Sequence, residues 1–262
     1  MSIVTLDGEI IHYEVLGRGR PLFFLHGWVG SWRYWIPTMQ AASITYRAYA
    51  IDMWGFGDTA KRAERYTLEQ QVKLLDSFME ALGIAKIAIV GHGLGAVVGL
   101  NFVVKNPQLV DRALLTGFPL GNSAVSARLR SAPLPELVDW LLGKTPGTDA
   151  ARAEANKTDP QAVRVSLDDM DALNLLDQTM RMTTPCLFVH GQNDPAVEAP
   201  PVELLNTLPD NTHEVIFDAT GHFPMLDDAN KFNRLLADFL SLPSGVSPRD
   251  LQLKEEWKRR VR

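Results

Sequence analysis

Eight short apolar segments, separated by turns or by helical patterns, constrain the fold of this 262-residue chain most strongly. Most of them are uninterrupted apolar runs rather than alternating ones, which is typical of strands that are covered on both faces of a parallel sheet. The first two flank Asp7-Gly8, a dipeptide that favours a hairpin turn. We expect strands at 3–6, 10–16, 22–25, 46–51, 87–90, 113–115, 187–189 and 215–217.

Helical patterns lie between these segments. Residues 67–70 (TLEQ) form a capping box, apolar residues then recur at helical spacing as far as Leu82, and Gly83 is suited to end the helix. A second apolar stripe at 232–240 follows two acidic residues, whose charge favours a helix N-terminus. Strands that alternate with helices indicate a doubly wound α/β sheet.

The alternation stops in the middle of the chain. Several helix signals occur there, at Pro135, Gly143, Thr148 and Asp159-Pro160, but no strand pattern. A segment of about 60 residues is too long for a loop in a compact domain. We therefore expect a helical cap over the carboxyl edge of the sheet. The predicted division is a core domain of residues 1–119 and 183–262 with a cap, or lid, at 120–182.

The strand segment at 87–90 runs directly into Gly91-His92-Gly93-Leu94-Gly95, and a helical pattern of small and apolar residues follows. A strand, a turn flanked by glycines and a helix form the context of a nucleophile elbow. Small residues are needed there because the strand and the helix approach closely. The middle position, which carries serine in an active enzyme, is occupied by Gly93. Glycine has no side chain and cannot form an acyl intermediate.

Four further motifs accompany this turn. In chain order they are 21–27 (PLFFLHG), 52–59 (DMWGFGDT), 190–195 (HGQNDP) and 221–224 (GHFP). Together with the elbow they resemble the α/β-hydrolase superfamily, especially its small capped esterases, lactonases and peroxidase-like members. The resemblance covers nearly the whole chain. It implies the α/β-hydrolase fold, with a mostly parallel eight-stranded sheet, helices on both faces and a helical cap insertion.

The resemblance also implies a role for individual residues. His222 matches the general base, Asp194 the carboxylate that orients it, and Gly93 the position of the nucleophile. The backbone N–H groups of Trp28 and Leu94 match the two oxyanion donors, which do not depend on side-chain identity. The order of elbow, acid and base along the chain is that of this fold.

Four residues are expected to contact the substrate: His26, Trp54, Phe118 and Met225. Their character suggests an apolar pocket for a small acyl-type ligand. A place in the packed core is the alternative for each, and for His26 a packing role beside the site is the preferred one. Esters or lactones as substrates follow from the family resemblance.

Gly93 leaves three explanations open. The serine was replaced deliberately, or the chain is a natural ligand-binding protein that lost hydrolysis, or it is a natural enzyme in which His222 and Asp194 activate water or move a substrate proton. In each case the serine-dependent chemistry is absent or strongly impaired. Glycine adopts strained elbow dihedrals without a Cβ clash, so we expect the fold to be at least as stable as with serine.

Composition excludes several classes of function. The formal net charge of −5 and the pI of about 5.7 mean that the chain has no excess positive charge to attract nucleic acid or an anionic membrane. The N-terminal residues lack a signal-peptide pattern, and no apolar run approaches the roughly 20 residues of a membrane span. No P-loop, dinucleotide fingerprint or H-E-x-x-H motif occurs. We expect a cytoplasmic protein without a metal or cofactor.

The C-terminal segment predicts one more helix. Ser247-Pro248 is a typical helix start, and Leu253, Trp257 and Val261 lie four residues apart. The helix is expected to dock on the body of the protein or on a partner subunit, which would make a homo-oligomer possible. A solvated tail is the alternative.

Overall fold

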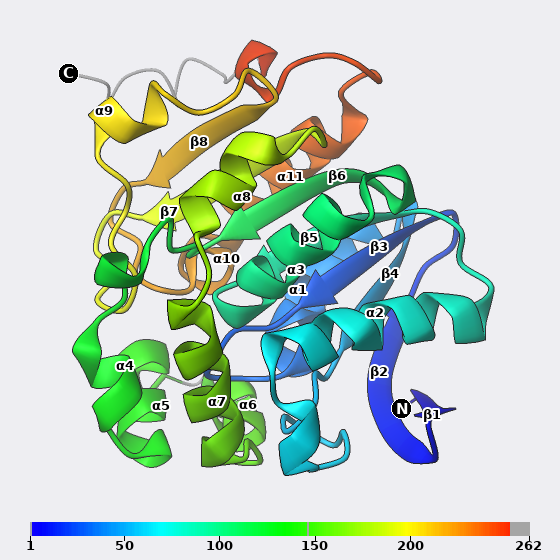
Figure 1. Ribbon diagram of the computed structural model, residues 1–262, viewed down its shortest axis with the longest axis vertical. Helices are drawn as coiled ribbons and strands as arrows, with labels where there is room; N and C mark the ends of the chain where they lie inside the picture. The colour runs from blue at the N-terminus through cyan, green and yellow to red at the C-terminus, as the bar shows by residue number, and fades with distance from the viewer. Residues whose placement is uncertain (1, 146, 252–262) are drawn as a thin grey trace.

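The computed structural model describes residues 2–145 and 147–251, which form an eight-stranded sheet with helices on both faces (Figure 1). The strand order is β1-β2-β4-β3-β5-β6-β7-β8. The strands are β1 Ser2–Leu6, β2 Glu9–Leu16, β3 Arg20–Leu25, β4 Tyr46–Ile51, β5 Ile87–His92, β6 Val110–Thr116, β7 Cys186–Gly191 and β8 Thr212–Phe217. All eight predicted strand segments are confirmed, as is the fold class.

The sheet is antiparallel only at its first edge. β1 and β2 form a hairpin in which Leu6 is opposite Glu9. Asp7 and Gly8 have φ values of 51° and 81°, the two left-handed conformations that a tight hairpin turn requires. β2 is antiparallel to β4, and each neighbouring pair from β4 to β8 is parallel. The carboxyl ends of the six parallel strands therefore lie at one edge, where such folds bind ligands.

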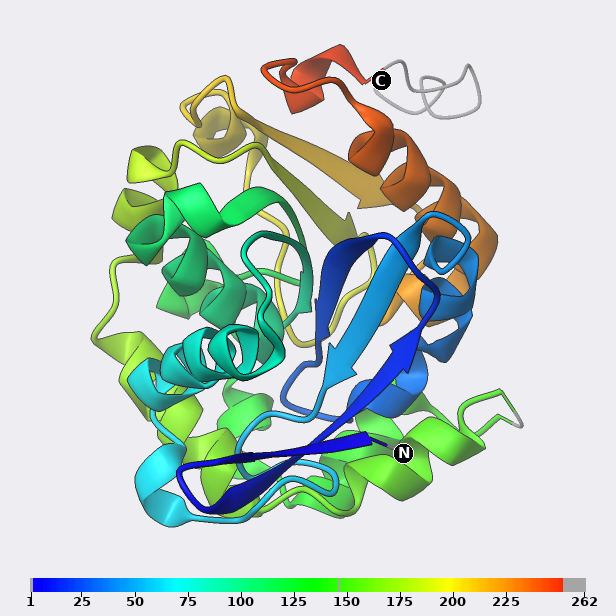
Figure 2. The same ribbon diagram turned by 90° about the vertical axis from the view of Figure 1, so that its right-hand side faces the viewer.

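Two layers of helices cover the sheet. α1 (Ile36–Ala42) and α11 (Ala229–Ser241) lie on one face, and α2 (Leu68–Leu82), α3 (Leu94–Lys105) and α8 (Leu175–Arg181) lie on the other (Figure 2). α2 has the predicted ends. The Thr67 hydroxyl accepts a hydrogen bond from the Gln70 N–H at 3.3 Å, and Gly83 ends the helix with a φ of 64°. α3 is buried almost all round, which fixes the elbow that precedes it.

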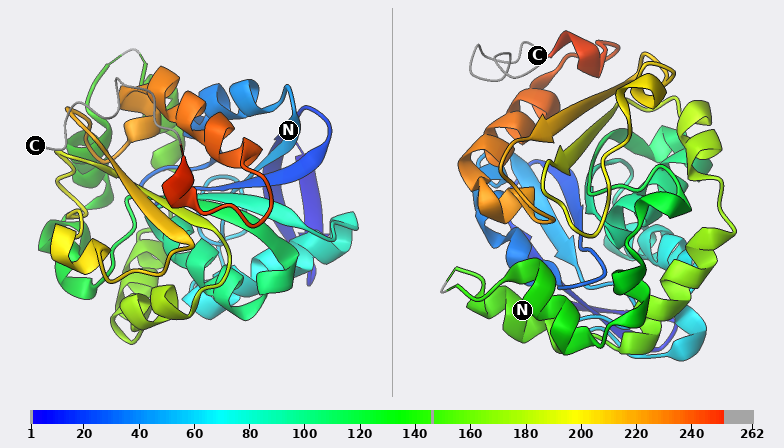
Figure 3. Two further views of the ribbon diagram at one scale, coloured as in Figure 1. Left: turned by 90° about the horizontal axis from the view of Figure 1, so that it is seen from above. Right: turned by 90° about the vertical axis from the view of Figure 1, so that its left-hand side faces the viewer.

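The middle of the chain forms the expected helical insertion. Its helices are α4 Ala127–Ser131, α5 Leu134–Leu142, α6 Asp149–Ala155 and α7 Pro160–Asp171. They lie beyond the carboxyl ends of the strands, as the right-hand view of Figure 3 shows. α8 belongs to the range predicted for the cap, but it packs against α3 beside the sheet. It provides the crossover that the parallel strands β6 and β7 need. The exact domain boundary stays a prediction.

The remaining elements are short. They are α9 Val202–Leu205, α10 Pro224–Asp227 and the 3-10 helices η1 Trp32–Trp35, η2 Ala63–Arg65, η3 Pro107–Leu109, η4 Asn122–Ala124 and η5 Pro248–Asp250. The Ser247 hydroxyl accepts a hydrogen bond from the Arg249 N–H and thus starts η5 as predicted. The rest of the expected C-terminal helix lies outside the described residues. Among the helices described, none has the length and apolar character to cross a membrane.

Two glycines let β3, β5 and α3 approach each other at the elbow. A Cβ on Gly91 would lie 2.5 Å from the carbonyl oxygen of Gly95, and a Cβ on Gly95 would lie 2.5 Å from the carbonyl carbon of Leu25. Both neighbours are backbone atoms, which cannot move aside without displacing a strand or a helix. The small residues predicted for this turn are therefore required by packing.

We expect Gly95→Ala to lower the free energy of unfolding by about 1–3 kcal/mol or more, because the added methyl overpacks the contact between β3 and α3. Urea unfolding measures this change. Gly121→Ala is the matched control, since a Cβ there meets no atom within 4 Å. Equal unfolding midpoints for the two variants would contradict the packing argument.

Candidate active site

Gly93 has the backbone geometry of a nucleophile elbow. Its φ is 50° and its ψ is −112°, between the end of β5 and the start of α3. Its N–H donates to the Thr116 carbonyl at 3.0 Å, and its own carbonyl accepts from the N–H groups of Ala96 and Val97. A residue with a Cβ would be strained in this conformation, and glycine is not. The elbow is thus fully formed although it presents no side chain.

His222 and Asp194 form a buried pair. The Nδ1 atom of His222 lies 3.0 and 2.9 Å from the two carboxylate oxygens of Asp194. The carboxylate also accepts hydrogen bonds from the N–H groups of Ala196 and Val197, at 2.8 and 3.1 Å. Burial raises the pKa of Asp194, but the charge of His222 and these hydrogen bonds outweigh burial and hold the pKa below its usual value. The acid is therefore ionised and fixed in orientation.

The second ring nitrogen of His222 is not used by the protein. Nε2 is buried and has no hydrogen-bond partner among the described residues. The ring lies beside His92, the residue before Gly93, with a ring centroid distance of 4.5 Å. The three distant segments predicted from sequence therefore converge, and the atom that would accept a proton is free.

Two backbone donors are also free. Within the described parts of the chain, the N–H groups of Trp28 and Leu94 have no hydrogen-bond partner. Leu94 is the first residue of α3, where N–H groups have no partner inside the helix and attract negative charge. The Gly95 N–H donates to the His26 carbonyl at 2.9 Å, which holds the two loops together. These are the two donors expected for an oxyanion.

The indole of Trp28 covers the elbow. Two of its ring carbons lie 3.1 and 3.2 Å from the position that a Cβ on Gly93 would occupy. Its Nε1–H donates to the Ser166 hydroxyl on α7 at 3.2 Å, and the side chain is fully buried. The elbow is therefore covered by this ring, which is hydrogen-bonded to α7. The sequence indicated a role for the Trp28 backbone but did not indicate where its side chain lies.

The residues expected to contact a substrate are all buried. Phe118, Met225 and Trp54 belong to the apolar core around the carboxyl ends of the strands, so their contact with a ligand stays a prediction. His26 has no free ring nitrogen. One nitrogen accepts from the Met53 N–H at 3.0 Å, and the other lies 2.9 Å from the Gly27 carbonyl. His26 therefore holds the loops in place, the packing role that was preferred.

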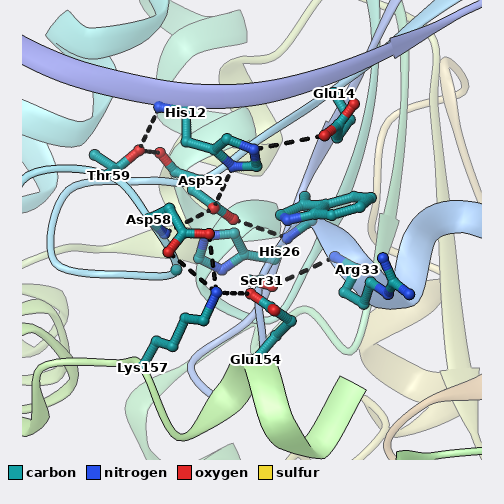
Figure 4. Close-up of polar contacts among 12 residues, drawn as sticks. His12, Glu14, His26, Ser31, Arg33, Asp52, Asp58, Thr59, Glu154 and Lys157 are labelled. Carbon is teal, nitrogen blue, oxygen red and sulfur yellow. Dashed lines mark hydrogen bonds and ion pairs between the residues drawn. The ribbon is translucent and has the colours of Figure 1, made fainter. Parts of the chain in front are cut away.

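A second buried histidine–carboxylate pair, His12 and Asp52, lies beside the loop that follows β3 and contacts the N–H of Trp32 (Figure 4). His12 Nδ1 is 2.8 Å from a carboxylate oxygen of Asp52. Asp52 also accepts hydrogen bonds from the backbone N–H groups of Trp32 and Asp58, and so holds the turn after β4 in place. Lys157 extends the network to the cap through two contacts with the Asp58 carboxylate. This pair is not marked in the local sequence, because its members are 40 residues apart.

The His12–Asp52 pair predicts a pH dependence of stability. Burial lowers the pKa of His12, but the hydrogen bond and the charge of Asp52 outweigh burial and raise it above the ordinary 6.5. The stabilisation is complete below 6.5, where the unfolded chain is protonated too, and it is lost as the pH rises through the raised pKa of the folded state. In urea unfolding from mildly acidic to alkaline pH, His12→Gln should lose less stability than the native chain. If the free energy of unfolding of the two proteins changed equally with pH, this assignment would be wrong.

Comparisons with known proteins agree with the observed fold. Residues 22–235 match the sequence model of a family described as "Alpha/beta hydrolase family". The chain is 26% identical to 2-hydroxy-6-oxo-6-(2'-aminophenyl)hexa-2,4-dienoic acid hydrolase of Metapseudomonas resinovorans, over 93% of this chain and 92% of that protein.

Two solved structures have the same fold. One is a serine-to-glycine mutant of the N-acyl homoserine lactonase AidH complexed with N-hexanoyl homoserine lactone (TM-score 0.80, 21% identity, covering 91% of this chain and 96% of that chain). The other is an esterase from Exiguobacterium antarcticum (TM-score 0.80, 18% identity, covering 92% and 98%).

Proposed function

The chain belongs to the alpha/beta hydrolase family, and we propose that it hydrolyses small apolar esters or lactones slowly, with water activated directly by His222 and without an acyl-enzyme. One observation carries the proposal. Nε2 of His222 has no hydrogen-bond partner among the described residues, and Asp194 orients its ring. The ring lies 4.5 Å from that of His92, the residue before Gly93, which has no side chain. A general base therefore stands next to a position from which the usual nucleophile is missing.

The proposed reaction uses groups of this chain and one water molecule. His222 Nε2 accepts a proton from the water as its oxygen attacks the carbonyl carbon of the ester. The N–H groups of Trp28 and Leu94 stabilise the charge that develops on the carbonyl oxygen. When the carbon–oxygen bond to the leaving group breaks, the imidazolium returns the proton to that oxygen, and an acid and an alcohol are released. Asp194 stabilises the imidazolium throughout.

The reaction is expected to be slow. In serine hydrolases that lose the nucleophile, binding and the oxyanion donors retain about 10³–10⁴-fold of rate enhancement over water. The closed site adds a conformational step, because the Trp28 indole covers Gly93 and is hydrogen-bonded to Ser166. A single hydrogen bond to the cap allows the ring to move when a ligand enters.

The surroundings and the relatives support the substrate class. The buried side chains of Trp28, Phe118 and Met225 provide an apolar environment for an acyl group. An esterase, a lactonase and a dienoic acid hydrolase are among the similar proteins. The lactone complex of a serine-to-glycine mutant of AidH supports binding of an intact acyl ligand by such a variant.

The test is steady-state hydrolysis of p-nitrophenyl esters of increasing acyl length and of a series of acyl lactones. We expect saturable turnover, linear from the first turnover and without a burst. Binding of these compounds without turnover above the buffer rate would contradict the proposal and would identify a ligand-binding protein instead.

A further inference from the structure

Three hydrogen bonds connect the loop after β3, which contains Gly27 and Trp28, with the elbow at Gly93 and with the loop that carries His222. The Gly27 N–H donates to the Tyr34 hydroxyl at 2.6 Å. The Tyr34 oxygen lies 2.9 Å from Nδ1 of His92. Nε2 of His92 lies 2.8 Å from the backbone carbonyl of His222. The side chains of Tyr34, His92 and His222 are all buried, so water does not compete for these groups.

With both side chains neutral, only one arrangement of protons satisfies this chain of bonds. The His222 carbonyl is an acceptor, so Nε2 of His92 must carry the proton. Nδ1 of the neutral ring is then an acceptor, and the Tyr34 hydroxyl must donate to it. The Tyr34 oxygen remains free to accept from the Gly27 N–H. Burial and the charge of His222 lower the pKa of His92, and burial raises the pKa of Tyr34, so both side chains are neutral in this arrangement.

Neighbouring residues leave space for the His92 ring and confine it. A Cβ on Gly27 would lie 2.8 Å from Nδ1 of His92, and a Cβ on Gly117 would lie 3.4 Å from its Cδ2. The ring of Phe223 contacts His92 and Tyr34, with centroid distances of 4.7 and 5.2 Å. Any larger residue at position 27 would therefore displace the histidine from its two partners.

We propose that Tyr34 and His92 are positioning residues that hold both oxyanion donors and the base in one fixed arrangement. The Gly27 peptide group directly precedes the N–H of Trp28. His92 stands two residues before Leu94, and its second partner is the backbone of the base itself. Loss of any one of these bonds would release the Trp28 donor, the Leu94 donor or the His222 base, all three of which must meet at the substrate carbonyl. This inference rests on the proposed function for its kinetic consequences, although the proton arrangement itself does not.

Tyr34→Phe tests the proposal because it removes only the hydroxyl. We expect kcat to fall by about 10–100-fold with little change in KM, since small misplacements of reacting groups have effects of this size. Tyr46→Phe is the matched control. The Tyr46 hydroxyl also makes two hydrogen bonds, to Arg20 and to the Leu240 carbonyl, but at the opposite ends of the strands. The control should lose stability in urea without losing kcat.

The imidazole nitrogens provide a readout that does not depend on turnover. In ¹⁵N-detected NMR of the full chain, His92 should be the Nε2–H tautomer, with Nδ1 accepting a hydrogen bond. In Tyr34→Phe the Nδ1 signal should move toward the position of an unbonded ring nitrogen.

Two results would overturn the proposal: an Nδ1–H tautomer of His92, or an unchanged kcat in Tyr34→Phe. If the native chain shows no turnover at all, the proposed function fails, and the tautomer alone then decides the positioning claim.

Discussion

Gly93→Ser should increase the rate of ester hydrolysis by about 10³-fold or more, with a burst of released alcohol as the acyl-enzyme forms. The His222–Asp194 pair, the unbonded Nε2 of His222 and the unbonded N–H groups of Trp28 and Leu94 are already present, as the proposed function requires. The added hydroxyl would stand at the elbow beside His222, which can take its proton. Stopped-flow measurement with a p-nitrophenyl ester detects both the burst and the steady rate.

The same substitution should destabilise the fold by about 1–3 kcal/mol, because a non-glycine residue is strained at this elbow. A φ of 50° contributes this strain, and the new Cβ would lie 3.1 Å from a ring carbon of Trp28. Gly93→Ala is the matched control, since it introduces the same Cβ without a nucleophile. We expect the two variants to lose similar stability in urea, and only the serine variant to gain rate. A serine variant as stable as the native chain would refute the strain argument.

His222→Asn should remove the activity of the native chain, with a loss of about 10²–10⁴-fold, which is the usual contribution of a general base. Asparagine is polar and of similar size, but it cannot accept a proton from water at neutral pH. His213→Asn is the control, because His213 lies on β8 away from the elbow, where burial and the nearby charge of Arg249 lower its pKa. Equal rates in the His222 variant and the native chain would mean that another group activates the water.

The strands and the long helices were predictable because their signals are local. Apolar runs, most of them uninterrupted, and the hairpin signal at Asp7-Gly8 identified the strands. The capping residue Thr67 and the terminal Gly83 fixed the ends of α2. The short helices α1 and α8 were not predicted. Each has seven residues, too few to show a helical period, and each is stabilised by contacts with another helix.

The site was predictable in its backbone and less so in its side chains. Motifs placed Gly93, Asp194 and His222 because each follows a strand whose carboxyl end lies at the same edge. The position of the Trp28 indole was not predictable, because it depends on a partner 138 residues away. The bond between His92 and the His222 carbonyl spans 130 residues and likewise leaves no mark in the local sequence.

Intact-mass analysis of the native chain during turnover of a p-nitrophenyl ester tests most directly whether water activated by His222 hydrolyses the ester without an acyl-enzyme. We expect continuous release of alcohol with no acylated protein at any time, while Gly93→Ser under the same conditions becomes acylated at residue 93. An acyl adduct on the native chain during turnover would contradict this expectation, because a protein nucleophile would then have replaced water activated by His222.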